Sequence, residues 1–150
     1  MERKLLDMMN RLSISEYNPR MKYCDKFQFF KLRTLELEDL AMLIDFNQKE
    51  EITIPGMNNG TGTMTAKMYM DDHGKVIPCS IHAGGSIGLH KHETSDDINY
   101  VLFGKGKAIC DGQEEILSVG TCHICKKGSA HSIVNTGDED LVLLTIVVER

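Results

Sequence analysis

The sequence lacks the long apolar runs and the excess of positive charge that two large classes of protein require. No stretch approaches the ~18 consecutive apolar residues that are needed to span a bilayer. The 17 Lys and Arg residues against 22 Asp and Glu residues give a formal net charge of −5, whereas nucleic-acid-binding proteins normally present a basic face. We therefore expect neither a membrane protein nor a nucleic-acid-binding protein.

An uninterrupted apolar leader and an even set of cysteines are also missing. The opening segment, MERKLLDMMNRLSISE, breaks its apolar residues with Asp7, Asn10 and Arg11, unlike the apolar core of a signal peptide. The five cysteines, an odd number, are scattered over positions 24, 79, 110, 122 and 125. Together these features predict a cytoplasmic protein whose thiols are reduced.

What is present is the composition of one globular domain, with 150 residues of which 41% are hydrophobic and 26% charged. The first fifty residues differ from the rest in the spacing of their apolar residues. Apolar residues recur at helical spacing in residues 1–17, and a second candidate helix runs from about Thr34, a suitable N-cap, to Phe46. We predict a helical N-terminal extension over residues 1–50.

From residue 51 onward, short β-prone runs alternate with turns that are rich in glycine and aspartate. The Asp111-Gly112 pair between two such runs is a strong signal for a β-hairpin. Strands at this spacing, with no helical pattern between them, are typical of an antiparallel barrel or sandwich. Residues 51–150 are therefore predicted to form an all-β domain.

The stretch GGSIGLHKHETSDDINYVLFGKG carries residues that can bind a metal ion. His90 and His92 are two apart, so on a strand both side chains project from one face, with Cα atoms about 7 Å apart. Asp96 or Asp97 could supply an oxygen ligand, and His131 lies on another β-like segment. Such a mixed nitrogen and oxygen site suits a divalent transition metal (Mn, Fe, Co, Ni or Zn) better than Mg or Ca.

At these residues the chain resembles the cupin superfamily. The first cupin motif is a glycine, five residues, His-x-His, three or four residues, a glutamate, six residues and a glycine. This sequence matches it with Gly84, His90, His92, Asp97 and Gly104, where Asp97 stands in place of the glutamate.

The second cupin motif is a glycine, five residues, Pro-x-Gly, two residues, a histidine, three residues and an asparagine. Here it runs from Gly120 through Gly128 and His131 to Asn135, with Lys126 in place of the proline. The resemblance covers roughly residues 55–150 and is to small cupins with a single barrel. It implies a cupin-type antiparallel β-barrel, or jelly roll.

The resemblance also implies a ligand set of His90, His92, Asp97 and His131. Aspartate is one methylene shorter than glutamate, so its carboxylate reaches less far into the barrel, and Asp96 is the reserve candidate. If the segment that contains Asp97 is a strand, Asn99 shares the inward face with Asp97, which makes it a candidate pocket residue.

Simpler interpretations of these residues remain open. A His-x-His pair can be solvated on a polar strand, and Asp97 lies in a turn-prone run. The Cys122–Cys125 spacing is that of a redox or zinc pair. The resemblance places it on a strand, where the two thiols face opposite sides, so we interpret them as packing or surface cysteines. His82 and His123 are candidates for the mouth of the barrel.

Three imidazoles and one carboxylate leave one or two positions on an octahedral metal for a small ligand. The resemblance implies two hypotheses. The first is a metal-dependent enzyme of the isomerase, dioxygenase or decarboxylase type that acts on a sugar derivative or a carboxylate. The alternative is a non-catalytic cupin that binds a small ligand as a sensor. No side chain stands out as a general acid or base, and we expect a homodimer.

Overall fold

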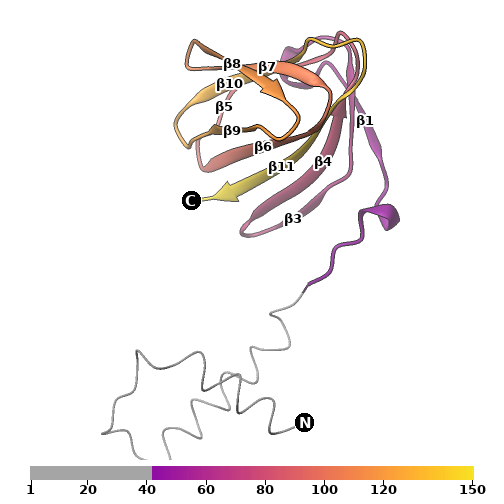
Figure 1. The fold of residues 1–150 in the computed structure, drawn as a ribbon. Coiled ribbons are helices and arrows are strands. Elements are labelled where there is room, and N and C mark those ends of the chain that lie inside the picture. Colours follow the sequence, from indigo (N-terminus) through magenta and orange to yellow (C-terminus); the bar gives the residue numbers. More distant parts are fainter. Residues whose placement is uncertain (1–41) are drawn as a thin grey trace, which may run out of the picture. The chain divides into compact units, whose positions relative to one another are not determined.

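The computed structural model describes residues 42–150 (Figure 1). Its elements are η1 (Phe46–Gln48), β1 (Ile52–Pro55), η2 (Met57–Asn59), β2 (Thr63–Ala66), β3 (Tyr69–Asp71), β4 (Gly74–Ile81), β5 (Ser86–Lys91), β6 (Ser95–Phe103), β7 (Lys105–Cys110), β8 (Gln113–Ser118), β9 (Cys122–Cys125), β10 (Ala130–Asn135) and β11 (Leu141–Glu149). No helix in this part of the chain is long and apolar enough to cross a membrane.

The helical prediction for the first fifty residues falls mostly outside the described residues. Residues 42–45, the end of the second predicted helix before Phe46, are described and are not helical. Asp45 has an extended backbone, and its carboxylate accepts a hydrogen bond from the Asn47 amide at 2.9 Å. This local cap starts the 3-10 turn η1, so a 3-10 turn begins at Phe46, where the sequence predicted the end of a helix.

All strand pairings are antiparallel and form two sheets that enclose the core (Figure 1). One sheet has the order β1-β2-β4-β11-β6-β9, with β3 also paired to β4, and the other has the order β5-β10-β7-β8. Both sheets contribute to one apolar core, with Ile81, Val101 and Leu143 from the first and Leu117 and Ile133 from the second. The predicted all-β jelly roll is confirmed.

The strand β11 organises the larger sheet because it pairs along its length with β4 on one side and β6 on the other. Its side chains alternate, so Leu141, Leu143 and Thr145 are buried toward the core while those between them are half-buried. This two-residue period is the ordinary geometry of a strand with one face on a core. It places Thr145, the one polar residue of that inward set, beside the interior cavity described below.

The predicted hairpin at Asp111-Gly112 joins β7 to β8, with Cys110 opposite Gln113. Asp111 and Gly112 have φ values of 47° and 83°. Two successive positive φ values define the tight turn that matches the twist of antiparallel strands, and Asp-Gly is a preferred pair for it. This turn fixes the register of β8 and therefore the position of Glu115 opposite Ala108.

Candidate metal centre

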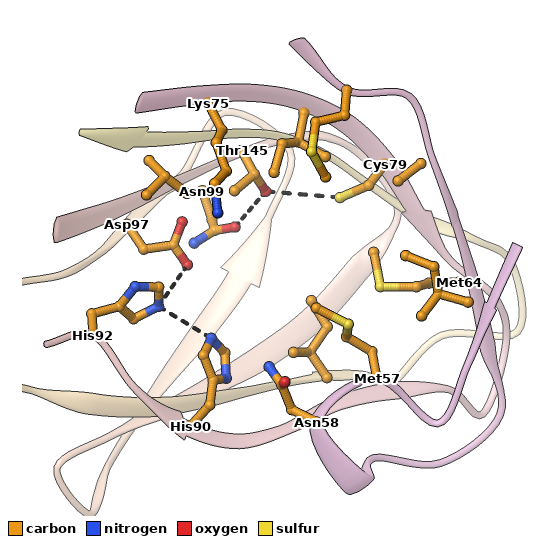
Figure 2. A pocket seen from close by; sticks show the side chains of 16 residues that line it. Met57, Asn58, Met64, Lys75, Cys79, His90, His92, Asp97, Asn99 and Thr145 are labelled. Atoms are coloured by element: carbon orange, nitrogen blue, oxygen red, sulfur yellow. Dashed lines mark hydrogen bonds and ion pairs between the residues drawn. The ribbon is translucent and has the colours of Figure 1, made fainter. Parts of the chain in front are cut away.

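Four side chains from both sheets converge inside the barrel. His90 lies in β5, His92 directly after it, His131 in β10 and Asp97 in β6 of the opposite sheet. His131 is the direct cross-strand partner of His90. One ligand atom from each of the four residues lies within 4.8 Å of the others. The structure therefore brings together the four residues that the two motifs single out, and Figure 2 shows three of them in one wall of a pocket.

Five of the six distances between the donor atoms are short and nearly equal, and the sixth, between His90 and Asp97, is within 4.8 Å. The Nε2 atoms of His90, His92 and His131 are separated by 3.1, 3.1 and 3.2 Å. Asp97 Oδ2 lies 3.1 Å from His131 Nε2 and 3.3 Å from His92 Nε2. Metal–ligand bonds of about 2.0–2.2 Å put neighbouring ligand atoms roughly 3.0–3.4 Å apart. The spacing of the four donors thus fits a single ion at their centre.

The hydrogen bonds around His90 show which ring nitrogen faces the centre. Its Nδ1 atom lies 2.9 Å from the carbonyl oxygen of Gly88, which can only accept, so Nδ1 carries the proton. The Nε2 atom of the neutral ring then presents a lone pair to the other three residues. Asp97 Oδ1 is buried without a hydrogen-bond partner among the described residues. A cation at the centre would bind the Nε2 lone pair of His90 and neutralise the buried carboxylate of Asp97, so the donor set fits a metal.

Burial and mutual contact set the charges of these groups. Desolvation is the largest influence on His90 and His92 and lowers the pKa of both imidazoles below the usual value. Desolvation by itself raises the pKa of Asp97, but the polar side chains of His131 and Asn99 and the charges of the nearby imidazoles outweigh it and leave that pKa lowered. Neutral imidazoles beside an ionised carboxylate are the protonation states that metal ligands require.

The backbone around the centre explains how the sequence positions it. After β5 ends, the His92 amide donates to the carbonyl of Ser129, and the Gly128 amide donates to the carbonyl of His92. Gly128 has φ +92°, which a glycine adopts without strain. The β10–β5 register shifts between His131 and Ile133. Bulges of this kind redirect side chains next to functional sites.

Asp96, the reserve ligand, points away from the centre. Its Oδ1 accepts from the Lys127 amide at 2.8 Å, and its Oδ2 pairs with Arg150 Nε at 2.7 Å. Tyr100 is exposed, whereas Asn99 is 1% exposed and lies in the cavity wall. The alternation along β6 is therefore the one expected from the sequence.

The centre lies at one side of a cavity of about 310 Å³ (Figure 2). Most of the wall is apolar and includes Met57, Met64 and Ile77. The polar part is formed by His90, His92 and Asp97 of the centre together with Asn58 of η2 and Asn99 and Thr145 of the larger sheet. Lys75 is the one lysine or arginine among the described residues that line the cavity, and in Figure 2 it extends toward Asn99.

Two residues lie near the centre although the sequence analysis did not assign them to it. Lys75 alternates with Ile77 and Cys79 along β4, and this period of two would have placed it on the inward face. His123 and Cys125 are the two buried, inward-facing residues of β9. The side chain of His123 is fully buried and contacts the outer face of His131, so it does not lie at the barrel mouth as predicted. His82 is half-exposed and lies 3.0 Å from Asp140.

The fold and site together define a small β-barrel with an interior cluster of nitrogen and oxygen donors. Residues 79–147 match the family described as cupin domain. The oxalate-binding protein of Thermotoga maritima is 38% identical over 117 residues, which are 74% of this chain and 97% of that relative. The pectin degradation protein KdgF of Dickeya dadantii is 30% identical over 76 residues, which are 50% of this chain and 69% of that protein. The chain belongs to the cupin family.

Solved structures show the same fold. A structure named as a predicted oxalate decarboxylase from Thermotoga maritima has a TM-score of 0.69 at 26% identity and covers 73% of this chain and 100% of that one. KdgF from Halomonas sp. has a TM-score of 0.61 at 17% identity, with 73% and 96% of the two chains covered. The family and the cluster together suggest a metal ion and a small-molecule ligand.

Proposed function

We propose that the protein binds a divalent transition metal through His90, His92, Asp97 and His131, and uses it to bind a small carboxylate in the adjoining cavity. The observation that carries the proposal is the convergence of three Nε2 atoms at 3.1–3.2 Å from one another, with a carboxylate oxygen 3.1–3.3 Å from two of them. Imidazole and carboxylate ligands favour Mn, Fe, Co, Ni or Zn.

The cavity supports a ligand that carries several oxygen atoms. The hydroxyl of Thr145 donates to Asn99 Oδ1 at 2.6 Å, which leaves the Asn99 amide group as a buried donor. That Nδ2 atom has no hydrogen-bond partner among residues 42–150. Lys75 adds a positive charge to the same wall. A ligand oxygen between Asn99 and Lys75 would satisfy both donors, and a carboxylate is the group that does so best.

The bound metal would act as a Lewis acid and orient two oxygen atoms of the ligand. The protein's own groups would divide the remaining work. Asn99 and Lys75 bind the ligand's outer oxygen atoms, and the apolar wall of Met57, Met64 and Ile77 excludes water from its other side. A cavity of about 310 Å³ limits the ligand to a small metabolite. The oxalate-binding relative gives oxalate as the first compound to test.

Metal content tests the ligand set directly. Untagged protein expressed with Mn, Fe, Co, Ni and Zn should contain nearly one metal ion per chain. His92→Ala and Asp97→Asn should lose most of it, because each removes a donor atom. Asp96→Asn is the matched control, since Asp96 has the same chemistry but pairs with Arg150. Wild-type protein without metal under every supply would refute the proposal. A metal-loaded Asp97→Asn would remove the carboxylate alone from the ligand set.

Titration calorimetry of the metal-loaded protein with oxalate tests the ligand. Lys75→Met should weaken binding about 10-fold or more, because charge-assisted hydrogen bonds contribute about 1.5–3 kcal/mol. Lys91→Met is the control, since Lys91 pairs with Glu93 on an exposed face. Equal affinity in the two variants would contradict the role of Lys75.

A second candidate function is catalysis of the isomerase, dioxygenase or decarboxylase type on a sugar derivative or carboxylate. The observation that favours it is Lys75, whose side chain lines the same cavity as His90, His92 and Asp97. An amine that lines the cavity can exchange protons with a bound ligand. Metal-loaded protein incubated with oxalate distinguishes the functions. Unchanged oxalate supports a binding or sensor protein, and its loss, abolished by Lys75→Met, supports an enzyme.

We propose further that the protein is a homodimer. Tyr100, Leu102 and Ile124 on β6 and β9 are 42–48% exposed, and a second copy could cover these side chains. Size-exclusion chromatography with light scattering should give twice the mass of the chain, and a clean monomer would refute the dimer.

The cytoplasm remains the compartment we propose. All four cysteines in the described part of the chain are free, as thiols are in a reducing environment. Thiol titration of the freshly isolated native protein under denaturing conditions should find these cysteines reduced, and a disulfide would contradict the assignment.

A further inference from the structure

A second buried histidine lies behind the candidate metal centre and is connected to the protein surface. His123 in β9 places its Nε2 atom 2.8 Å from Nδ1 of His131, on the side of that ring which faces away from the centre. On its other side, His123 Nδ1 lies 2.7 Å from the carboxylate of Glu115 in β8. The His123 side chain is 0% exposed, whereas that of Glu115 is 52% exposed. The three residues form a chain from the surface to the centre.

The chemistry of these groups fixes the direction of the two hydrogen bonds. A carboxylate can only accept, so Nδ1 of His123 carries the proton that it donates to Glu115. In a neutral ring the Nε2 atom of His123 is then an acceptor, and the donor in the second bond is Nδ1 of His131. A neutral His131 with its proton on Nδ1 has a bare Nε2 atom. That atom is the one that lies 3.1–3.2 Å from the other two histidines.

We propose that Glu115 and His123 are positioning residues that hold His131 in the tautomer required for metal binding and strengthen it as a ligand. This inference rests on the proposed metal site. Hydrogen bonds from a ligating histidine to an acceptor fix its ring and raise its basicity, and removing such a partner typically costs 10–100-fold in metal affinity. Here the acceptor is the imidazole of His123, which is itself hydrogen-bonded to the Glu115 carboxylate. The negative charge of Glu115 therefore raises the basicity of His131 through His123.

The other two histidines of the centre have different partners. His90 donates to the carbonyl of Gly88, and His92 lies 3.4 Å from the hydroxyl of Ser95, a long contact. Of the centre's histidines, His131 is therefore the one whose outer nitrogen leads to a negative charge among the described residues. The chain also joins the two sheets, because Glu115 and His131 belong to one and His123 to the other.

Glu115→Gln is the sharpest variant, because it removes the charge at a half-exposed position and keeps the size of the side chain. Glu114→Gln is the matched control, since Glu114 precedes it on β8 and pairs with Lys107 at 2.8 Å instead. His123→Phe removes the acceptor and leaves a buried N–H group of His131 unpaired. His123→Gln offers a carbonyl oxygen in its place and should restore part of the effect.

Two measurements on the full chain test the inference. Nitrogen-15 NMR of the metal-free protein at pH 8 should find the ring proton on Nδ1 in both His123 and His131. Competition titration with Zn²⁺ should show affinity weakened about 10–100-fold in Glu115→Gln and His123→Phe, partly restored in His123→Gln and unchanged in Glu114→Gln. Thermal unfolding of metal-free Glu115→Gln should match that of Glu114→Gln, which separates positioning from a structural role.

The outcomes separate the two proposals. If the wild type binds no metal, the proposed function fails and the positioning role fails with it. If the wild type binds metal and Glu115→Gln binds it equally well, the ligand set stands and the positioning chain is overturned. A proton on Nε2 of His123, with Nδ1 of His131 bare, would also overturn it, because the hydrogen bonds would then run in the opposite direction.

Discussion

Replacing Thr145 by valine removes one hydroxyl from the wall of the cavity. That hydroxyl donates to Asn99 Oδ1 at 2.6 Å and lies 3.7 Å from the thiol of Cys79 (Figure 2). Thr145 is 8% exposed and Asn99 1% exposed, so water cannot replace the lost donor easily. The substitution keeps the branched shape of the side chain, and its main effect is to leave Asn99 Oδ1 buried without a partner.

A buried polar group that loses its partner costs about 1–3 kcal/mol, whereas loss of both partners together can be nearly neutral. We therefore expect Thr145→Val to lower the free energy of unfolding by about 1–3 kcal/mol, which corresponds to about 4 °C in Tm for each kcal/mol. In an Asn99→Leu background the same substitution should cost less than about 0.5 kcal/mol. The Asn99 amide would also be free to rotate, so affinity for oxalate should fall.

Urea unfolding of the four proteins in this cycle measures the coupling between the two side chains. Thr53→Val is the control, because Thr53 is exposed on β1 and its substitution should stay within about 0.5 kcal/mol of the wild type. Equal costs of Thr145→Val in the two backgrounds would refute the hydrogen bond. A loss of stability with unchanged affinity for oxalate would refute the role of Asn99 as a fixed donor to the ligand.

Three other predictions follow from packing and burial. Burial raises the pKa of the Cys79 thiol to about 11. At pH 8, iodoacetamide should therefore modify the exposed Cys122 much faster than Cys79, as followed by mass spectrometry. Equal rates at the two cysteines would contradict this. Gly88→Ala would put a Cβ atom into the carbonyl oxygen of Asn58, so urea unfolding should show a loss of about 1–3 kcal/mol. Leu143→Ala, at a fully buried position in β11, should cost about 2–5 kcal/mol in the same assay.

The all-β fold was predictable because its local signals agree with one another. The Asp111-Gly112 turn has the two positive φ values that this pair favours, and β11 alternates buried and half-buried residues along an apolar run. Turn chemistry and a period of two act over a few residues, so a sequence displays them openly. The predicted end of the second helix was wrong because the side chain of Asp45 caps a 3-10 turn there. The spacing of apolar residues does not reveal such a hydrogen bond.

Strand parity and motif spacing predicted the four candidate ligands, but not the residues around them. His90 and His92 share a face by parity, and the parity of β6 separates Asp97 from Asp96 once the strand is fixed. The partnership of His123 with His131 depends on the packing of β9 against β10 across the two sheets. No spacing within the sequence encodes such a distance. Lys75 was missed for a simpler reason, since a charged residue in a strand is usually assigned to solvent.

The way the centre is assembled links its chemistry to the integrity of the barrel. His90 and His131 are neighbours on one sheet, so their separation is set by a single ladder of hydrogen bonds. Asp97 and His123 approach the same imidazole of His131 from the other sheet, at 3.1 Å and 2.8 Å. The ring of His131 is therefore fixed at both nitrogens by groups that hold their places only while the two sheets stay packed. A metal ion shared by His90, His131 and Asp97 would bridge the sheets in turn, so metal binding should stabilise the fold because only the folded chain brings these donors together.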